Sequence, residues 1–323
     1  MSDVPTIHTE GLSKVYRTGF WMRPHTGLRP LDLRVERGQV FGFIGPNGAG
    51  KTTTIKILMG IHAATSGSAT LMGKDHRDPE SRRSVGFMPE RPYFYPHLTG
   101  AELLDFYGRL CEVPEPTRSQ RARALLERVD MSRAADQPLR GYSKGMLQRV
   151  GICQALINDP QLVVLDEPMS GLDPLGRALV RDLILEERAA GRTVFFSSHI
   201  LHDVETMSDA VAILIGGELR SQGSVPTLLG QVSRGLELAL RLPPGHTPAD
   251  DAAMEAILGG ALRHQPDQRA LLRLDHDDAD RAAAAVAAAG CRLLALTPLR
   301  GSLEDLLLSE IERAGAAARG GRP

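Results

Sequence analysis

A glycine-rich loop that runs into a lysine is the segment of this chain best suited to chemistry. Residues 45–53 read Gly-Pro-Asn-Gly-Ala-Gly-Lys-Thr-Thr and fit the pattern G-x-x-x-x-G-K-[ST]. In such a loop the backbone N–H groups face phosphate oxygens, and the following helix adds partial positive charge at its N-terminus. Lys51 is expected to reach the β- and γ-phosphates, and Thr52 to offer its hydroxyl to Mg²⁺. The nucleotide-binding residues predicted from this loop are Gly45, Pro46, Asn47, Gly48, Ala49, Gly50, Lys51, Thr52 and Thr53.

Two acidic residues follow a short apolar run further along the chain. Residues 162–165 read Leu-Val-Val-Leu and are succeeded by Asp166, Glu167 and Pro168. Such a run is typical of a strand that is buried on both faces of a parallel sheet, whose polar ends meet the binding crevice. Asp166 is therefore a candidate Mg²⁺ ligand, and Glu167 a candidate base for an attacking water molecule. The alternative is that both residues only cap a turn before Pro168, and the phosphate loop upstream disfavours it.

The elements that must position these residues alternate between strand and helix. Strand patterns at 39–44, 161–166, 193–197 and 210–215 are separated by helical patterns such as 52–59 and 175–190. That alternation predicts an α/β sheet. Residues 90–160 carry helical patterns without a convincing strand, so we expect a helical subdomain inserted into the sheet core.

The chain is expected to divide near residue 230. We predict a nucleotide-binding domain over 1–230, with the helical subdomain at about 90–160, and an accessory domain over 231–315. Beyond 230 the pattern is strand 236–242, helix 249–258, strands 261–264 and 270–274, helix 278–289 and strand 291–296. This βαββαβ order predicts a small ferredoxin-like α+β domain, followed by a helix over 302–312. The tail from Ala314, in particular 316–323, is expected to be disordered, and Thr18–Arg29 is expected to be a loop of unassigned role.

Bulk composition narrows the class of protein. The 323 residues carry a formal net charge of −1, so no global field favours nucleic acid or anionic lipid. The three cysteines lie far apart without pairing or metal-ligand spacing, which fits a reducing compartment. We find neither a signal-peptide pattern at the N-terminus nor an apolar run near the ~18 residues that span a bilayer. A cytoplasmic protein that reaches a membrane only through a partner is predicted.

Five motifs in order resemble those of ABC-type ATPases. They are the phosphate loop 45–52, the octapeptide 142–149 (Tyr-Ser-Lys-Gly-Met-Leu-Gln-Arg), the acidic strand 162–168, the segment 170–173 (Ser-Gly-Leu-Asp) and the pair 198–199 (Ser-His). The resemblance covers roughly residues 5–230. It implies the P-loop NTPase fold of an ABC-type ATPase, with ATP and Mg²⁺ as its ligands.

The octapeptide resembles the family signature, commonly written Leu-Ser-Gly-Gly-Gln, and keeps its Ser143 and Gly145. The resemblance implies that these two residues contact the γ-phosphate of an ATP held by a second subunit. Ser143 could also be only the N-cap of the helix that follows, and both roles can hold together. By the same resemblance Asp173 belongs to the D-loop, which lies across the subunit interface and organises the partner's phosphate site.

Three further positions take roles from the resemblance. His199 matches the switch histidine that hydrogen-bonds the γ-phosphate, so the expected catalytic set is Lys51, Glu167 and His199. Tyr16 matches the aromatic residue that stacks on adenine, and its alternative role is that of an ordinary edge-strand aromatic. Glu90 stands where the family usually has glutamine. A carboxylate there can still ligate Mg²⁺ or its water, so the expected metal ligands are Thr52, Glu90 and Asp166.

Residues 91–97 are dense in aromatic side chains (Tyr93, Phe94 and Tyr95) in a chain with 4% aromatics. Three interpretations compete: docking of a partner, core packing of the helical subdomain, and a solvated turn.

The function predicted is that of an ATP-binding and ATP-hydrolysing motor subunit of an ABC transporter, resembling the ABC-2-type exporter group. A homodimer or heterodimer of ATPase subunits would close around two ATP molecules and drive separate integral membrane permease subunits from the inner face of the cell membrane. No nucleic-acid partner is expected. The main alternative is a soluble ABC ATPase that acts on ribosomes or DNA, and a regulatory subunit without hydrolysis is disfavoured because Glu167 is present.

Overall fold

The computed structural model describes residues 4–18, 22–230, 235–245, 247, 251, 252, 255, 261–274, 279–299 and 301–320. The chain forms two compact units. One comprises Met1–Val225 together with Glu310–Pro323, and the other comprises Pro226–Ser309. The division comes five residues before the predicted boundary at 230, and the end of the chain belongs to the first unit rather than to the second.

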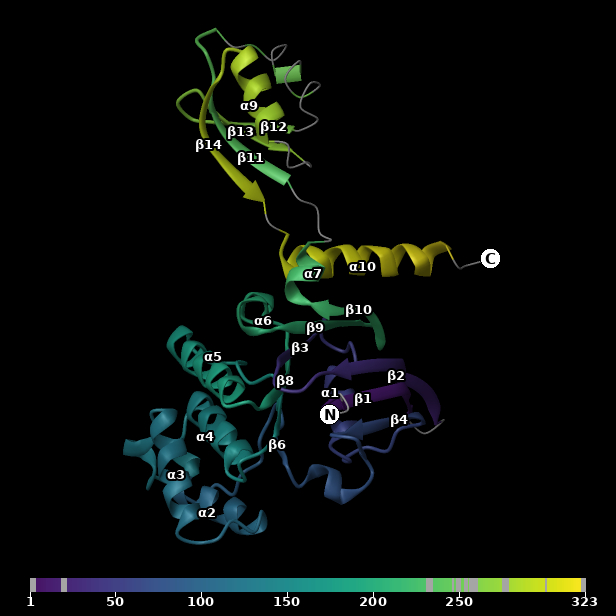
Figure 1. Ribbon diagram of the computed structural model, residues 1–323, viewed down its shortest axis with the longest axis vertical. Coiled ribbons are helices and arrows are strands. Elements are labelled where there is room, and N and C mark those ends of the chain that lie inside the picture. The colour runs from purple at the N-terminus through teal and green to yellow at the C-terminus, as the bar shows by residue number, and fades with distance from the viewer. Residues whose placement is uncertain are drawn as a thin grey trace. The chain divides into compact units, whose positions relative to one another are not determined.

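A six-stranded sheet forms the centre of the first unit (Figure 1). Its strand order is β10-β9-β3-β8-β7-β6, in which all neighbours are parallel except the hairpin of β9 and β10. The strands are β3 (Val40–Ile44), β6 (Val85–Met88), β7 (Leu162–Asp166), β8 (Thr193–Ser198), β9 (Ala210–Ile215) and β10 (Glu218–Ser224). Every residue of β3, β7 and β8 is buried, which explains their continuous apolar sequences.

Helices α1 (Lys51–Leu58) and α5 (Pro174–Ala189) pack on this sheet and correspond to the helices predicted at 52–59 and 175–190. Helix α6 (Leu201–Met207) also packs on the sheet, and the short helix α7 (Val225–Leu229) follows β10 in the chain. The hydrophobic core includes three phenylalanine rings, since Phe195 of β8 lies 5.8 Å from Phe41 and 5.3 Å from Phe43 between ring centroids. Burying aromatic rings of this size dominates the energetics of a core.

The predicted loop at Thr18–Arg29 is wrong, because this segment is mostly strand. A four-stranded antiparallel sheet of order β2-β1-β4-β5 contains β1 (Ile7–Thr18), β2 (Arg23–Val35), β4 (Ser66–Leu71) and β5 (Lys74–Asp75). The β1–β2 pairing continues to its last residue pair, Thr18 with Arg23. Phe20 and Trp21 of the predicted loop lie outside the described residues.

The helical subdomain is confirmed, and Figure 1 shows it beside the central sheet. It consists of α2 (Gly100–Leu110), α3 (Thr117–Arg128) and α4 (Lys144–Leu156), with short 3₁₀ turns η2 (Ser132–Ala134) and η3 (Leu139–Gly141); another turn, η1 (Pro79–Arg82), precedes β6. Helix α2 begins with a capping box, in which Thr99 and Glu102 each bond the other's backbone N–H.

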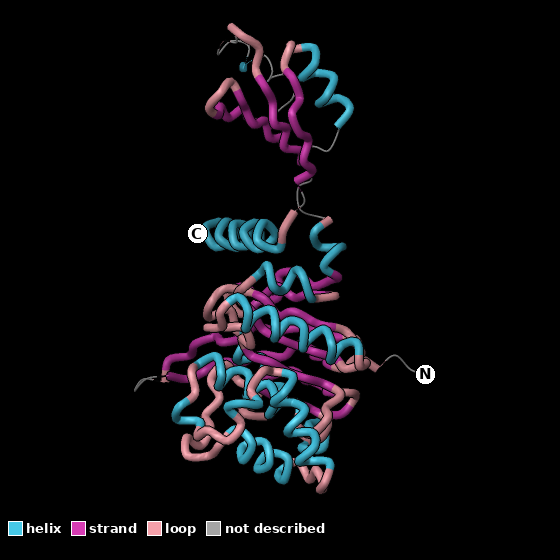
Figure 2. The backbone as a smooth tube through the Cα atoms, turned by 90° about the vertical axis from the view of Figure 1, so that its left-hand side faces the viewer, coloured by secondary structure: helices cyan, strands magenta, loops and turns pink. Residues whose placement is uncertain are grey.

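The second unit contains a four-stranded antiparallel sheet of order β12-β13-β11-β14, with α9 (Ala279–Ala288) packed on β14 (Figure 2). Its strands are β11 (Gly235–Arg241), β12 (Ala261–Gln265), β13 (Arg269–Leu274) and β14 (Arg292–Leu299). In chain order the described elements are β11, β12, β13, α9 and β14, which agree in type with the corresponding members of the predicted series. The expected helix at 249–258 lies mostly outside the described residues.

The expected disordered tail is wrong over most of its length. Helix α10 (Leu303–Gly320) continues well beyond the predicted end at residue 312. Within the first unit, Glu310 is nearly buried, accepts a hydrogen bond from Ser221 of β10 at 3.3 Å and pairs with Arg313 at 2.9 Å. Alanine-rich sequence supports helix as readily as it signals disorder, which accounts for the difference.

Candidate functional site

The glycine-rich loop joins the end of β3 to the start of α1. Gly45 has a φ of 155°, and a Cβ atom there would lie 2.1 Å from the carbonyl oxygen of Leu214 in β9. A side chain at this position is therefore excluded by backbone contact as well as by conformation. The loop is pressed against a neighbouring strand where the carboxyl ends of the sheet strands meet.

Lys51 lies across this loop. Its ammonium nitrogen donates to the carbonyl oxygens of Gly45 at 2.6 Å and Pro46 at 3.3 Å. It also lies 3.7 Å from Oε1 of Glu167, and its side chain is only 6% exposed. A buried ammonium that is satisfied by carbonyl groups and one carboxylate is well placed to exchange these partners for phosphate oxygens.

The carboxylate of Asp166 is held at the end of β7 by two hydroxyls. Thr52 donates to its Oδ1 at 3.3 Å, and Ser197 of β8 donates to the same oxygen at 2.6 Å. Ser197 also accepts the backbone N–H of Glu167 at 2.9 Å. One serine on the adjacent strand thus fixes both acidic residues relative to the loop.

Burial raises the pKa of Asp166, and the nearby carboxylates of Glu167 and Glu90 raise it further, while hydrogen bonds from Ser197 and Thr52 oppose the shift. The charged form of Asp166 is therefore disfavoured by the protein groups around it. A cation bound beside it would relieve this cost.

We expect Asp166→Asn to stabilise the nucleotide-free protein at neutral pH. A carboxyl group whose pKa is raised on folding lowers stability above that raised pKa, and the penalty disappears as the pH falls below the ordinary value of 3.8. Asparagine keeps the accepting Oδ1 without the charge. Thermal unfolding in the presence of EDTA should be followed from pH 4 to 8. The melting temperature of the variant should rise relative to that of the wild type as the pH rises. A difference in melting temperature that is independent of pH would contradict the charge argument.

Glu167 and His199 face each other across the site. The Nδ1 atom of His199 lies 2.7 Å from Oε2 of Glu167. Glu167 has a φ of 53°, a left-handed conformation that is uncommon for a residue with a side chain. Gln148 of α4 supports this conformation by donating to the carbonyl oxygens of Glu167 at 3.1 Å and Pro168 at 3.0 Å.

The predicted residues converge on one cavity of about 530 Å³. Those that line it are Tyr16, Asn47, Gly48, Ala49, Gly50, Lys51, Thr52, Thr53, Glu90, Glu167 and His199, together with His25, Gly27 and Ser170. Gly45, Pro46 and Asp166 belong to the same site through their hydrogen bonds with Lys51 and Thr52.

Besides Gly45, Pro46 and Asp166, three further predicted residues do not line this cavity, namely Ser143, Gly145 and Asp173. Ser143 is exposed and forms the N-cap of α4, where its hydroxyl accepts the N–H of Met146 at 3.3 Å. Asp173 caps α5 in the same way, accepting the N–H of Gly176 at 2.8 Å. Ser143 therefore has the capping role that the sequence allowed as an alternative, and it is exposed at the surface.

Sequence reasoning assigned no role to Ser197, Gln148 or His25. Ser197 lies near the carboxyl end of β8 (Thr-Val-Phe-Phe-Ser-Ser), where side chains meet the binding crevice, and that position was the available signal. Gln148 stands in the quoted octapeptide, but its carbonyl partners on the acidic strand depend on how α4 packs. His25 lies in the segment that was predicted to be a loop.

Two features are absent from the part of the chain that the structure describes. No group of three or more His, Cys, Asp or Glu side chains there is arranged to hold a metal ion. No helix there has the length and apolar character needed to cross a membrane.

The fold and the site together define a P-loop ATPase, with the helical subdomain that ABC-type members insert into the sheet core. A family model described as ABC transporter matches residues 28–170. The solved "Structure of ATP binding subunit of ABC transporter" superposes with a TM-score of 0.64 at 30% identity, covering 70% of this chain and 92% of that one.

Curated relatives extend the match to nearly the whole chain. The Synechocystis protein named Uncharacterized ABC transporter ATP-binding protein sll0415 is 42% identical over 313 residues, 96% of this chain and 85% of that protein. Nod factor export ATP-binding protein I of Ralstonia nicotianae is 34% identical over 234 residues, 71% of this chain and 70% of that protein. The chain belongs to the ABC transporter ATP-binding proteins, and it is an ATP-binding and ATP-hydrolysing subunit.

Proposed function

We propose that the cavity holds the triphosphate of ATP on the loop 45–53, with Lys51 neutralising its terminal phosphates. The observation that carries this assignment is the convergence of Lys51, Glu167 and His199, from three separate elements, on one cavity at the mouth of the glycine loop. Glu167 then acts as the base that orients or deprotonates the attacking water, and His199 positions the carboxylate of Glu167.

The residues beside the loop fit a magnesium ion. A buried carboxylate with a raised pKa, a threonine hydroxyl bonded to it, and a second carboxylate at the cavity wall form a hard-oxygen site with excess negative charge. We assign the ion to Thr52, Asp166 and Glu90, of which Glu90 is the least expected because the family usually has glutamine there. Mg²⁺ in such a site would neutralise charge on the phosphate oxygens, while Ser197 keeps Asp166 turned toward Thr52.

The position of the signature residues supports an ATPase dimer. Ser143 and Gly145 stand at the start of α4, where N–H groups and a helix dipole favour an anion, but they do not line the chain's own cavity. We assign them to the phosphate of an ATP bound by a second ATPase subunit, with Asp173 at the same interface. In this arrangement ATP stabilises the closed pair, and hydrolysis removes the shared contacts.

The working protein is proposed to be a transporter motor whose membrane-spanning part is a separate permease. The Ralstonia relative is named for export, so we propose that the ATPase drives export from the inner face of the cell membrane.

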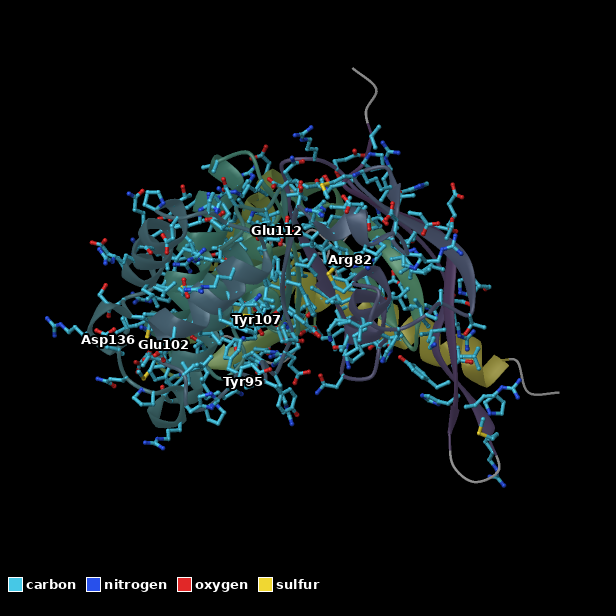
Figure 3. The ribbon with its side chains drawn as sticks, turned by 90° about the horizontal axis from the view of Figure 1, so that it is seen from below. Arg82, Tyr95, Glu102, Tyr107, Glu112 and Asp136 are labelled. Carbon is cyan, nitrogen blue, oxygen red and sulfur yellow. The ribbon has the colours of Figure 1, made fainter. Side chains whose placement is uncertain are left out.

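The surface that fits a permease lies on the helical subdomain. Phe94 packs inward, with its ring 6.3 Å from that of Tyr107, whereas Tyr93 is 91% exposed and Tyr95 is 55% exposed. Tyr95 and Tyr107 lie on the same side of the subdomain (Figure 3), because each contacts the ring of Phe106 between them. Exposed aromatic side chains are typical anchors of protein interfaces.

Replacement of Tyr93 and Tyr95 by alanine tests the transporter assignment. We expect the double variant to keep the ATPase activity of the isolated subunit and to bind its permease at least about tenfold more weakly, because aromatic anchors dominate interface energy. Co-purification of tagged subunit from native membranes measures this, with Met22→Ala, another exposed apolar residue, as the control. Undiminished recovery of the permease would contradict this docking surface. Recovery of ribosomes or DNA in place of any membrane protein would contradict the transporter assignment.

A further inference from the structure

The β1–β2 hairpin brings a second aromatic ring to the nucleotide cavity. Tyr16 of β1 and His25 of β2 are directly opposite each other in the strand register. Directly opposed residues of antiparallel strands project their side chains on the same face, with Cβ atoms about 5 Å apart. Both residues line the cavity that contains the glycine loop. The segment without an assigned role thus contributes to the site.

Several contacts hold Tyr16 in place. Its hydroxyl donates to Oγ1 of Thr53 at 3.3 Å and lies 3.0 Å from Nδ1 of His62. The ring of His62 meets it edge-on at 5.8 Å between centroids, and the ammonium of Lys14 lies 5.2 Å from the ring centroid. Because Thr53 belongs to α1, these contacts fix the hairpin rings relative to the phosphate-binding end of the cavity.

A bulge in β2 makes room for this ring. The register passes from Lys14 opposite Leu28 to Val15 opposite Thr26, which leaves Gly27 as an extra residue. A Cβ atom at Gly27 would lie 2.5 Å from Cε2 of Tyr16, so the ring lies directly on the glycine backbone. The bulge therefore aims the Tyr16–His25 pair at the cavity.

We propose that His25 is a base-recognition residue, whose imidazole stacks with the purine ring of the nucleotide beside Tyr16. This inference rests on the proposed function of the cavity as an ATP site. Among the described residues that line the cavity, the rings belong to Tyr16, His25 and His199. His199 is bonded to Glu167 at the phosphate end. Tyr16 and His25 are therefore the rings available to contact the base. Stacking on two rings favours the larger purine over a pyrimidine.

The test measures binding of ADP and CDP to the full-length protein by calorimetry, since neither is a substrate for γ-phosphate hydrolysis. We expect His25→Ala to weaken ADP binding about tenfold, the usual effect of removing a base-stacking ring, and to weaken CDP binding clearly less. His25→Phe, which keeps a ring without the imidazole nitrogens, should restore ADP binding. The control is His8→Ala, which removes a histidine on β1 that does not line the cavity.

Each other outcome overturns the assignment. Unchanged ADP affinity in His25→Ala means that His25 does not contact the base. Equal weakening of ADP and CDP places its effect on the ribose or phosphates, and failure of His25→Phe to restore binding excludes stacking. A wild-type protein that binds neither nucleotide would contradict the proposed ATP site itself, which separates failure of that function from failure of this inference.

Discussion

Glu167→Gln is expected to lower the rate of ATP hydrolysis at least about a hundredfold while leaving ATP binding intact. A positioned general base contributes about 10²–10⁴-fold to a rate, and glutamine keeps the size of the side chain without its basicity. In the structure this carboxylate lies 3.7 Å from the Lys51 ammonium and 2.7 Å from Nδ1 of His199. The amide can occupy the same space, so the phosphate loop should keep its shape.

The same variant should accumulate as a dimer in ATP, because the step that would separate the subunits is blocked. Light scattering after size-exclusion chromatography in Mg-ATP measures the mass, and phosphate release measures the rate. Glu186→Gln is a suitable control, since Glu186 lies on α5 and pairs with Arg128 away from the cavity. Hydrolysis at the wild-type rate by Glu167→Gln would mean that another group activates the water.

Sequence alone predicts the parts of this site that are continuous along the chain. The glycine loop and the acidic strand each combine a fixed residue spacing with a fully buried strand, β3 or β7, so local pattern and burial agree. Contacts such as Ser197 with Asp166 join residues 31 positions apart. They follow from β7 and β8 being sheet neighbours, and the local pattern of either strand does not specify that neighbour.

The β1–β2 hairpin was missed for a physical reason. The first residues of β2, from Arg23 to Thr26, are all exposed, so no alternation of apolar and polar side chains marks the strand. Pro24 lies in this segment and also lowers the expectation of strand, although an edge strand such as β2 tolerates proline. His25 could therefore be assigned to the cavity only after the register of the pair was known.

Ser143→Arg is expected to lower the rate of ATP hydrolysis about a hundredfold or more. A single subunit of the variant should still bind ADP. Removing one hydrogen-bond donor from a charged transition state costs about 10²–10³-fold, and the long side chain also blocks close approach of a second subunit. The lost helix cap costs only about 1 kcal/mol of stability. Ser119→Arg, at an exposed site on α3, controls for the added charge and bulk.

Mixing two inactive variants distinguishes a shared site from a site built within one chain. In a head-to-tail dimer each site takes Lys51 from one subunit and Ser143 from the other. A dimer of one Ser143→Arg subunit and one Lys51→Ala subunit therefore has one site with both substitutions and one site with neither. An equal mixture should therefore recover about a quarter of the wild-type activity, since half of the dimers are mixed and each has one of two sites intact. Failure of the mixture to recover any activity would contradict independent shared sites. Loss of ADP binding in isolated Ser143→Arg would instead place Ser143 at its own subunit's nucleotide, against its exposed position outside that cavity.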